Sequence, residues 1–158
     1  MADLLHWEDF EVGQVFDYGS YTVTEEEIVA FAEEYDPQRF HLDDAYARTT
    51  ILGGICASGW HSAGIWMRLF SDGYANRAAS LGSPGVDDIR WFKPVRPGDV
   101  LTGRSEILAR RASNSRPDLG LNTMKHQLLN AAGEVVMEMH STQMLRRRTA
   151  LATGGERA

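Results

Sequence analysis

The chain has 158 residues, a length that suits one domain, and its 43% hydrophobic and 24% charged residues are typical of a folded globular protein. Its 16 basic and 22 acidic side chains give a net charge of −6, which argues against a nucleic-acid binder, because such proteins usually present a basic face. The one cysteine, Cys56, can form neither an intramolecular disulfide nor a multi-cysteine zinc site, and it suits a reducing compartment.

The ends and the apolar segments carry no visible targeting or membrane signal. The N-terminus lacks the basic region and apolar run of a signal peptide. The longest uncharged stretch, Ile51–Met67, contains Gly, Ser and His, whereas a membrane span needs ~20 mostly apolar residues. We therefore expect a cytoplasmic protein without membrane or nucleic-acid partners. We also expect one domain over residues 1–148 and a disordered tail over 149–158, because that tail is small, polar and aperiodic.

The first half of the chain predicts helices after an extended segment at Glu11–Val23. The sequence Thr24-Glu-Glu-Glu is a capping box that begins a helix, because Glu27 can reach back to the Thr24 N–H. Apolar residues follow at helical spacing, namely Ile28, Phe31, Ala32 and Tyr35. Proline at position 37 ends this helix, since the residue before a proline is pushed out of the α region. A short acidic stretch at 43–47 predicts one or two further helical turns.

The next element is a helix rich in small residues, and it ends near Phe70. Glycine, alanine and serine dominate residues 53–64, and Trp60, Met67 and Phe70 are predicted to share its buried face. Each interior glycine costs ~1 kcal/mol against alanine, so this helix needs tertiary packing around it. We therefore expect it to be central in the fold.

The second half of the chain predicts β-structure. Strands are expected at 86–93, 100–111, 119–130 and 135–145, with a turn at 94–99 and a hairpin connection at 130–133. Helices followed by a run of antiparallel strands give an α+β pattern, in which a sheet wraps one buried helix.

The segment Asp36-Pro-Gln-Arg-Phe-His41 is the best candidate for chemistry. It places a carboxylate and an imidazole on one proline-stiffened turn, where both can meet a small molecule such as water and act as an acid–base couple. In the alternative interpretation, Asp36 only ends the helix and His41 is a loop histidine. Cys56 as a nucleophile competes with its more ordinary role as a buried packing thiol.

A metal site is the other alternative. His41 and Asp43, with a distant histidine from among His61, His126 and His140, have the residue types of a two-histidine, one-carboxylate iron triad. The last two histidines lie in strand patterns and are expected to be structural.

With the Asp36 and His41 pair in view, the chain resembles the MaoC-like dehydratases, the family that includes the (R)-specific enoyl-CoA hydratases. The likeness runs from about Glu11 to Arg146. It includes the helix ending Phe-Ala-Glu-Glu-Tyr35, the text His41-Leu-Asp-Asp-Ala-Tyr-Ala, Ser58-Gly-Trp-His61, Ser83-Pro-Gly85 and Arg90-Trp-Phe-Lys-Pro-Val-Arg-Pro-Gly-Asp99. The hydratases carry Asn and Pro where this chain has Gln38 and Arg39, and His-Gly-Met in place of Ser-Gly-Trp at 58–60.

The resemblance implies a hotdog fold, in which an antiparallel sheet wraps one long central helix, usually in a dimer. It implies that Asp36 and His41 hold and activate the water that is added to, or removed from, the 2,3-double bond of an acyl thioester. The Gly59 N–H, at the start of the central helix, is expected to polarise the thioester carbonyl. The expected substrate contacts are Gln38, Phe40, Ser58, Trp60 and His61.

We therefore expect an enoyl thioester hydratase (3-hydroxyacyl thioester dehydratase) of fatty acid metabolism that needs no cofactor and no metal. Its expected substrate is an acyl-CoA, with an acyl-carrier-protein thioester as the alternative carrier, and its expected assembly is a homodimer or a dimer of dimers. The alternative functions are a hotdog acyl-CoA thioesterase and a non-catalytic subunit that binds acyl thioesters.

Overall fold

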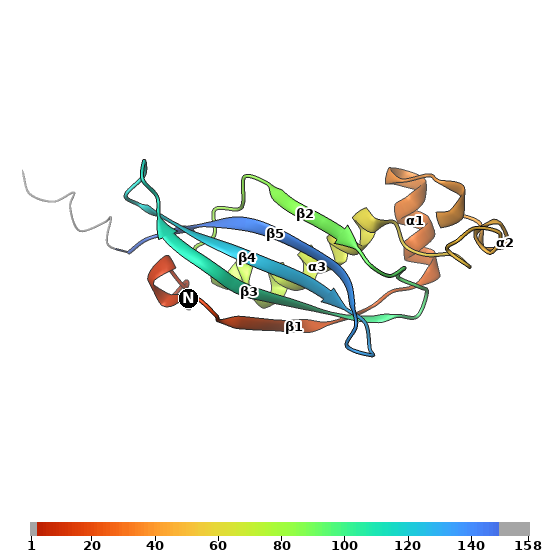
Figure 1. The fold of residues 1–158 in the computed structure, drawn as a ribbon, viewed down its shortest axis with the longest axis horizontal. Coiled ribbons are helices and arrows are strands. Elements are labelled where there is room, and N and C mark those ends of the chain that lie inside the picture. Colours follow the sequence, from red (N-terminus) through yellow and green to blue (C-terminus); the bar gives the residue numbers. More distant parts are fainter. Residues whose placement is uncertain (1–2, 149–158) are drawn as a thin grey trace, which may run out of the picture.

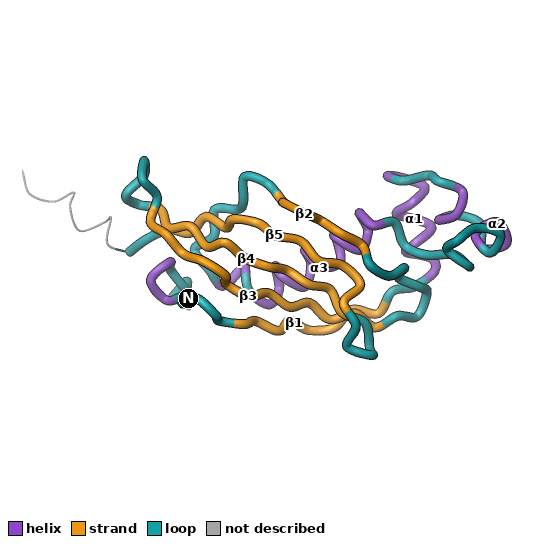
Figure 2. The backbone as a smooth tube through the Cα atoms, viewed as in Figure 1, coloured by secondary structure: helices purple, strands orange, loops and turns teal. Residues whose placement is uncertain are grey.

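The computed structural model of the chain describes residues 3–148 (Figure 1). One long helix lies against a curved sheet, and two shorter helices gather at one end of the molecule (Figures 1 and 2). The elements are β1 (Val15–Thr22), α1 (Glu25–Tyr35), α2 (Asp44–Ala47), α3 (Gly59–Gly73), β2 (Val86–Trp91), β3 (Val100–Ala112), β4 (Leu119–Leu129) and β5 (Val135–Arg146). Single 3₁₀ turns lie at Trp7–Asp9, Arg39–His41 and Ala75–Arg77. The tail expected over 149–158 lies outside the described residues.

The five strands form one antiparallel sheet in the order β1-β3-β4-β5-β2. Side chains alternate between buried and partly exposed along β4 and β5, because successive residues of a strand point to opposite faces. The buried face of the sheet packs on α3, and together they enclose the hydrophobic core. The α+β hotdog arrangement that the resemblance implied is confirmed.

The central helix α3 is buried as expected, but a different face of it meets the sheet. Phe70 is buried, whereas Trp60 and Met67 are 62% and 50% exposed, so the prediction that the three share a buried face is wrong. The buried residues of α3 are His61, Ser62, Ile65, Trp66, Leu69 and Phe70, of which His61 packs against α1. This stripe is offset from the Trp60–Gly64–Met67 stripe by about one residue, or ~100° around the helix, and it offers more apolar surface.

The helix α1 begins and ends where the sequence predicts. Thr24 Oγ1 accepts a hydrogen bond from the Glu27 N–H at 3.2 Å, and Glu27 Oε2 accepts one from the Thr24 N–H at 3.1 Å, which completes the capping box. Ile28 and Ala32 are fully buried, while Tyr35 is exposed. The helix stops at Asp36, whose backbone leaves the helical region directly before Pro37. This termination holds the Asp36 side chain at the end of a rigid element.

Among residues 3–148, no helix is both long enough and apolar enough to span a membrane.

A buried polar group lies in the core, between α3 and the sheet. The His126 ring lies with Nδ1 2.6 Å from Ser105 Oγ and Nε2 2.8 Å from Ser141 Oγ, and it packs against Trp66 at a centroid distance of 4.4 Å. Burial lowers the pKa of His126 to about 3, with a smaller contribution from His140. The ring is therefore neutral in the folded protein, and the structural role expected from its strand pattern agrees with this position.

We predict that His126 makes the protein sensitive to acid. Its pKa of about 3 in the folded state lies below the ordinary 6.5, so the unfolded chain binds a proton that the folded chain excludes between these values. The contribution of the neutral His126 to the free energy of unfolding should be fully present above pH 6.5. As the pH drops toward 3, the free energy of unfolding should fall by up to about 1.4 kcal/mol per pH unit. Denaturant titrations from pH 7 to pH 4 measure this slope.

His126→Gln should have a lower free energy of unfolding than the wild type at pH 7. Its slope of free energy against pH should be smaller by the contribution of about one proton. His6→Gln, which changes a ring near the surface, is the matched control and should keep the wild-type slope. Equal slopes for His126→Gln and the wild type would contradict the prediction.

Candidate active site

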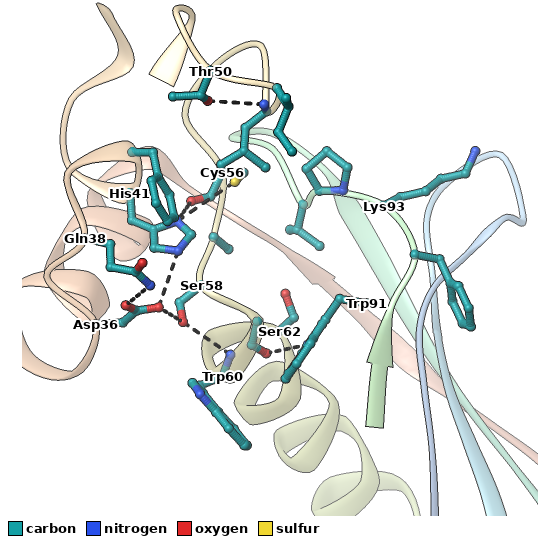
Figure 3. Close-up of a pocket in the computed structure, with 18 of the residues that line it drawn as sticks. Asp36, Gln38, His41, Thr50, Cys56, Ser58, Trp60, Ser62, Trp91 and Lys93 are labelled. Carbon is teal, nitrogen blue, oxygen red and sulfur yellow. Dashed lines mark hydrogen bonds and ion pairs between the residues drawn. The ribbon is translucent and has the colours of Figure 1, made fainter. Parts of the chain in front are cut away.

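A cavity of about 770 Å³ opens at the end of the molecule where α1, α2 and the start of α3 meet the end of β2 (Figure 3). The structure brings seven of the eight predicted site residues to its wall, and these are Asp36, Gln38, Phe40, His41, Ser58, Gly59 and Trp60. They come from three separate parts of the fold, the end of α1, the 3₁₀ turn after it and the first turn of α3.

Asp36 and His41 face each other across the turn that joins them. The Asp36 Oδ2 atom lies 3.3 Å from His41 Nε2, and the two side chains are only 16% and 8% exposed. Pro37 and the 3₁₀ turn at 39–41 fold the chain back, so residues five apart in sequence meet at one point of the cavity. The pairing expected from the sequence is therefore present in the geometry.

The other ring nitrogen of His41 is held by the backbone. His41 Nδ1 lies 2.7 Å from the Cys56 carbonyl oxygen. Because a carbonyl can only accept a hydrogen bond, Nδ1 carries the proton and donates it. In the neutral ring, Nε2 therefore has a free lone pair on the side of Asp36 and the cavity.

Two side chains hold the Asp36 carboxylate. Ser58 Oγ donates a hydrogen bond to Oδ2 at 2.6 Å, and Gln38 Nε2 donates one to Oδ1 at 2.8 Å. Burial raises the pKa of Asp36, but the hydrogen bonds from Ser58 and Gln38, with the charge that His41 carries when its ring is protonated, outweigh it, so the net pKa lies below its ordinary value. The group at the end of α1 is thus an ionised carboxylate at neutral pH.

Gly59 is the first residue of α3, where an N–H has no acceptor within the helix. Ser58 caps this helix, because its Oγ accepts the Trp60 N–H at 3.3 Å while its hydroxyl proton is given to Asp36. The Trp91 indole lies directly over Gly59, and its Nε1–H donates to the Gly59 carbonyl at 2.9 Å. A Cβ at position 59 would lie 2.5 Å from Trp91 Cε2, so glycine is required here by contact.

His61 does not line the cavity. Its ring is buried and stacks on Phe31 of α1 at 4.8 Å between centroids and 7° between planes. Burial lowers the pKa of His61, with Glu27 acting in the opposite direction. Position 61 lies on the side of α3 that faces α1, whereas Ser58 and Gly59 lie at the tip of the helix, and this places His61 in the packing between helices.

Several residues of the site were not found from the sequence. The Cys56 carbonyl carried no signal, because a main-chain oxygen is present at every residue. Trp91 and Lys93, at the end of β2, also line the cavity. In the sequence, only their position in Trp-Phe-Lys-Pro, directly before a sharp turn, indicated a role in the site. The contact of Trp91 with the start of α3 depends on the sheet topology.

The geometry does not favour the alternative sites. Burial raises the pKa of the Cys56 thiol, which disfavours the thiolate that a nucleophile needs. Asp43 caps α2 by accepting the Tyr46 N–H at 3.0 Å and pairs with Arg39, so its carboxylate is already occupied. No group of three His, Cys, Asp or Glu side chains within the described part of the chain is arranged to hold a metal ion.

The contact between Gly59 and Trp91 predicts a position-specific effect of alanine. Gly59→Ala should lower the free energy of unfolding by about 1–3 kcal/mol, because the added methyl overlaps a rigid indole. Gly64→Ala is the matched control on the same helix, since nothing lies within 4 Å of its added Cβ, and it should raise stability by up to about 1 kcal/mol. Denaturant unfolding measures both, and equal effects at the two positions would refute the contact.

Comparison with known proteins agrees with this fold. A sequence model of the MaoC-like domain matches residues 9–125. A MaoC-like dehydratase from Rhodospirillum rubrum is 41% identical, with a TM-score of 0.85 over 91% of this chain and 98% of that one. The R-hydratase PhaJ1 from Pseudomonas aeruginosa is 25% identical, with a TM-score of 0.74 over 92% and 88%. The beta-methylmalyl-CoA dehydratase of Chloroflexus aurantiacus is 29% identical over 116 residues, 72% of this chain and 32% of that enzyme. The chain belongs to the MaoC-like dehydratase family.

Proposed function

We propose that this protein is an enoyl thioester hydratase, which in the reverse direction is a 3-hydroxyacyl thioester dehydratase. The observation that carries the proposal is the approach of the ionised Asp36 carboxylate to His41 Nε2, 3.3 Å apart on the wall of a cavity that also holds the start of α3. The family and the R-hydratase among the similar structures support it.

The dyad suits a water molecule in contact with both groups. Such a water donates one hydrogen bond to the Asp36 carboxylate and the other to the free lone pair of His41 Nε2, which leaves its own lone pairs directed at the substrate. The Nδ1–H bond to the Cys56 carbonyl fixes the histidine in the tautomer that this requires. The low pKa of Asp36 keeps the carboxylate charged, so it orients the water and stabilises an imidazolium beside it.

In hydration, the water oxygen forms a bond to C3 of the enoyl thioester while one of its protons moves to His41 Nε2. The electron pair of the 2,3-double bond moves toward the thioester carbonyl and gives an enolate. The imidazolium then returns its proton to C2, so the product gains one complete water. The Gly59 N–H donates to the carbonyl oxygen, where the negative charge develops, and the positive end of the α3 dipole adds to this effect.

An acyl-CoA is the proposed substrate, and an acyl-carrier-protein thioester is the alternative carrier. The exposed aromatic side chains Trp60, Trp91 and Phe92 line the cavity, and they offer an apolar surface for an acyl chain next to the polar dyad. The named substrate of the Chloroflexus dehydratase is a CoA ester, which supports the choice of carrier. A hotdog thioesterase would direct the water to the carbonyl carbon, and a binding subunit would leave the dyad unused.

We also propose that the protein assembles as a homodimer or a dimer of dimers. The strand β2 forms one edge of the sheet and is mostly exposed, and the side chain of Val86 at its start is 52% exposed. An unpaired sheet edge leaves N–H and C=O groups without partners, and proteins of this size commonly cover such a surface by pairing with a second copy.

The first test is the loss of activity in the dyad variants. Asp36→Asn and His41→Gln should each lower the hydration rate of the best enoyl-CoA by about 10²–10⁴-fold, the usual effect of removing one positioned proton-transfer group. The loss of the absorbance of the 2,3-enoyl thioester measures the rate, and a panel of chain lengths and of carriers identifies the substrate.

The matched control is Glu33→Gln, which changes an exposed carboxylate on the same helix and should leave the rate unchanged. Wild-type rates in both dyad variants would overturn the assignment of the dyad. Release of free CoA from saturated acyl-CoA, with no hydration, would favour the thioesterase, and binding without turnover would favour the non-catalytic subunit.

The second test is the mass in solution. Light scattering at micromolar concentration should give at least twice the 17.6 kDa of one chain. Val86→Lys, which puts a charge on the β2 edge, should shift the mass toward one chain, whereas Val12→Lys, at an exposed valine before β1, should not. A single-chain mass for the wild type would contradict the proposal.

A further inference from the structure

We propose that Arg96 is a positioning residue for both groups of the dyad, and this inference rests on the function proposed above. Arg96 lies in the turn that joins β2 to β3, and it is not among the residues that line the active-site cavity. Its Nη1 donates hydrogen bonds to the Gly54 carbonyl at 2.6 Å and to the Ile55 carbonyl at 3.2 Å, and its Nη2 donates to the Leu52 carbonyl. One guanidinium thus binds three carbonyls of a single loop.

That loop leads directly into the partners of the dyad. The next residue after Ile55 is Cys56, whose carbonyl holds His41 Nδ1 at 2.7 Å. Two residues further along, Ser58 donates to Asp36 at 2.6 Å. The segment 52–57 lies outside the helices and strands, so contacts from other parts of the chain must set its path.

Two further contacts complete the attachment of the loop. Asp44 Oδ1 accepts the Ile55 N–H at 2.9 Å, and the Val95 carbonyl accepts the Ala57 N–H at 2.9 Å. Gly54, with a φ of +158°, lies between Arg96 and Asp44, and a Cβ there would be 3.4 Å from Arg96 Nη1 and from Asp44 Oδ1. The Arg96 side chain therefore packs closely against the loop as well as bonding to it.

The three carbonyls require an arginine. Its guanidinium holds several N–H donors in one rigid plane, whereas a lysine ammonium is a single point charge on a flexible stem. Without the fork, the carbonyls of Leu52, Gly54 and Ile55 lose their common anchor, and the backbone around Cys56 is held only by the two N–H contacts on either side of it. A displacement of ~1 Å in a catalytic group can cost about 10²-fold in rate.

The experiment compares Arg96→Lys and Arg96→Ala with the wild type by kinetics and by ¹⁵N NMR of the His41 ring. Arg96→Ala should lower kcat for the best enoyl-CoA by about 10–100-fold, with a KM within about threefold of the wild type, and Arg96→Lys should recover part of the loss. In the wild type the ¹⁵N shifts should report the Nδ1–H tautomer, and in Arg96→Ala they should move toward a mixture of tautomers. Arg90→Ala, at an exposed arginine of β2, is the control for the loss of one positive charge.

The outcomes separate this inference from the proposed function. Unchanged kcat and unchanged His41 shifts in either folded Arg96 variant would overturn the inference, and Arg96→Lys alone decides it if Arg96→Ala does not fold. Full activity in Asp36→Asn and His41→Gln would overturn the proposed function instead, while the His41 shifts would still show whether Arg96 sets the tautomer. A lower melting temperature with unchanged kcat and shifts would assign Arg96 to stability alone, against the inference.

Discussion

The hydrogen bond from Ser58 to Asp36 connects the two helices on which the site depends. Its donor is the residue that caps the start of α3, and its acceptor is the residue at which α1 ends. The same hydroxyl oxygen accepts the Trp60 N–H, so one side chain satisfies one of the unpaired N–H groups at the start of α3 and stabilises the Asp36 carboxylate. Without this bond, Asp36 would keep only the Gln38 amide as a side-chain hydrogen-bond donor.

The charge on Asp36 is a balance of opposing effects. Burial alone would favour the neutral acid, as it does for carboxyl groups in apolar surroundings. Hydrogen bonds to both oxygens and the neighbouring histidine reverse that preference. The substitution of glutamine for asparagine at position 38, relative to the hydratases that the chain resembles, keeps an amide donor within 2.8 Å of the carboxylate.

The surroundings of the dyad combine an irregular backbone with rigid neighbours. His41 is bonded to a carbonyl of a loop, and Gly59 is in contact with an indole from the edge of the sheet. The positions of both depend on β2 and the turn after it. The Val95 carbonyl accepts the Ala57 N–H of the loop, and the Trp91 indole donates to the Gly59 carbonyl at the helix start. The sheet therefore helps to position the groups around the dyad, although neither Asp36 nor His41 belongs to it.

The sequence by itself determined the local structure and the dyad. The capping box at Thr24, the stop at Pro37 and the alternation along β4 and β5 depend on neighbours within a few residues, and the Asp36–His41 pair lies within one turn. Only the tertiary structure decided which face of α3 is buried, that His61 packs on Phe31, and that Cys56, Trp91 and Arg96 serve the site. These features join residues far apart in the chain, often through backbone atoms that every residue shares, so side-chain identity and spacing carry no signal for them.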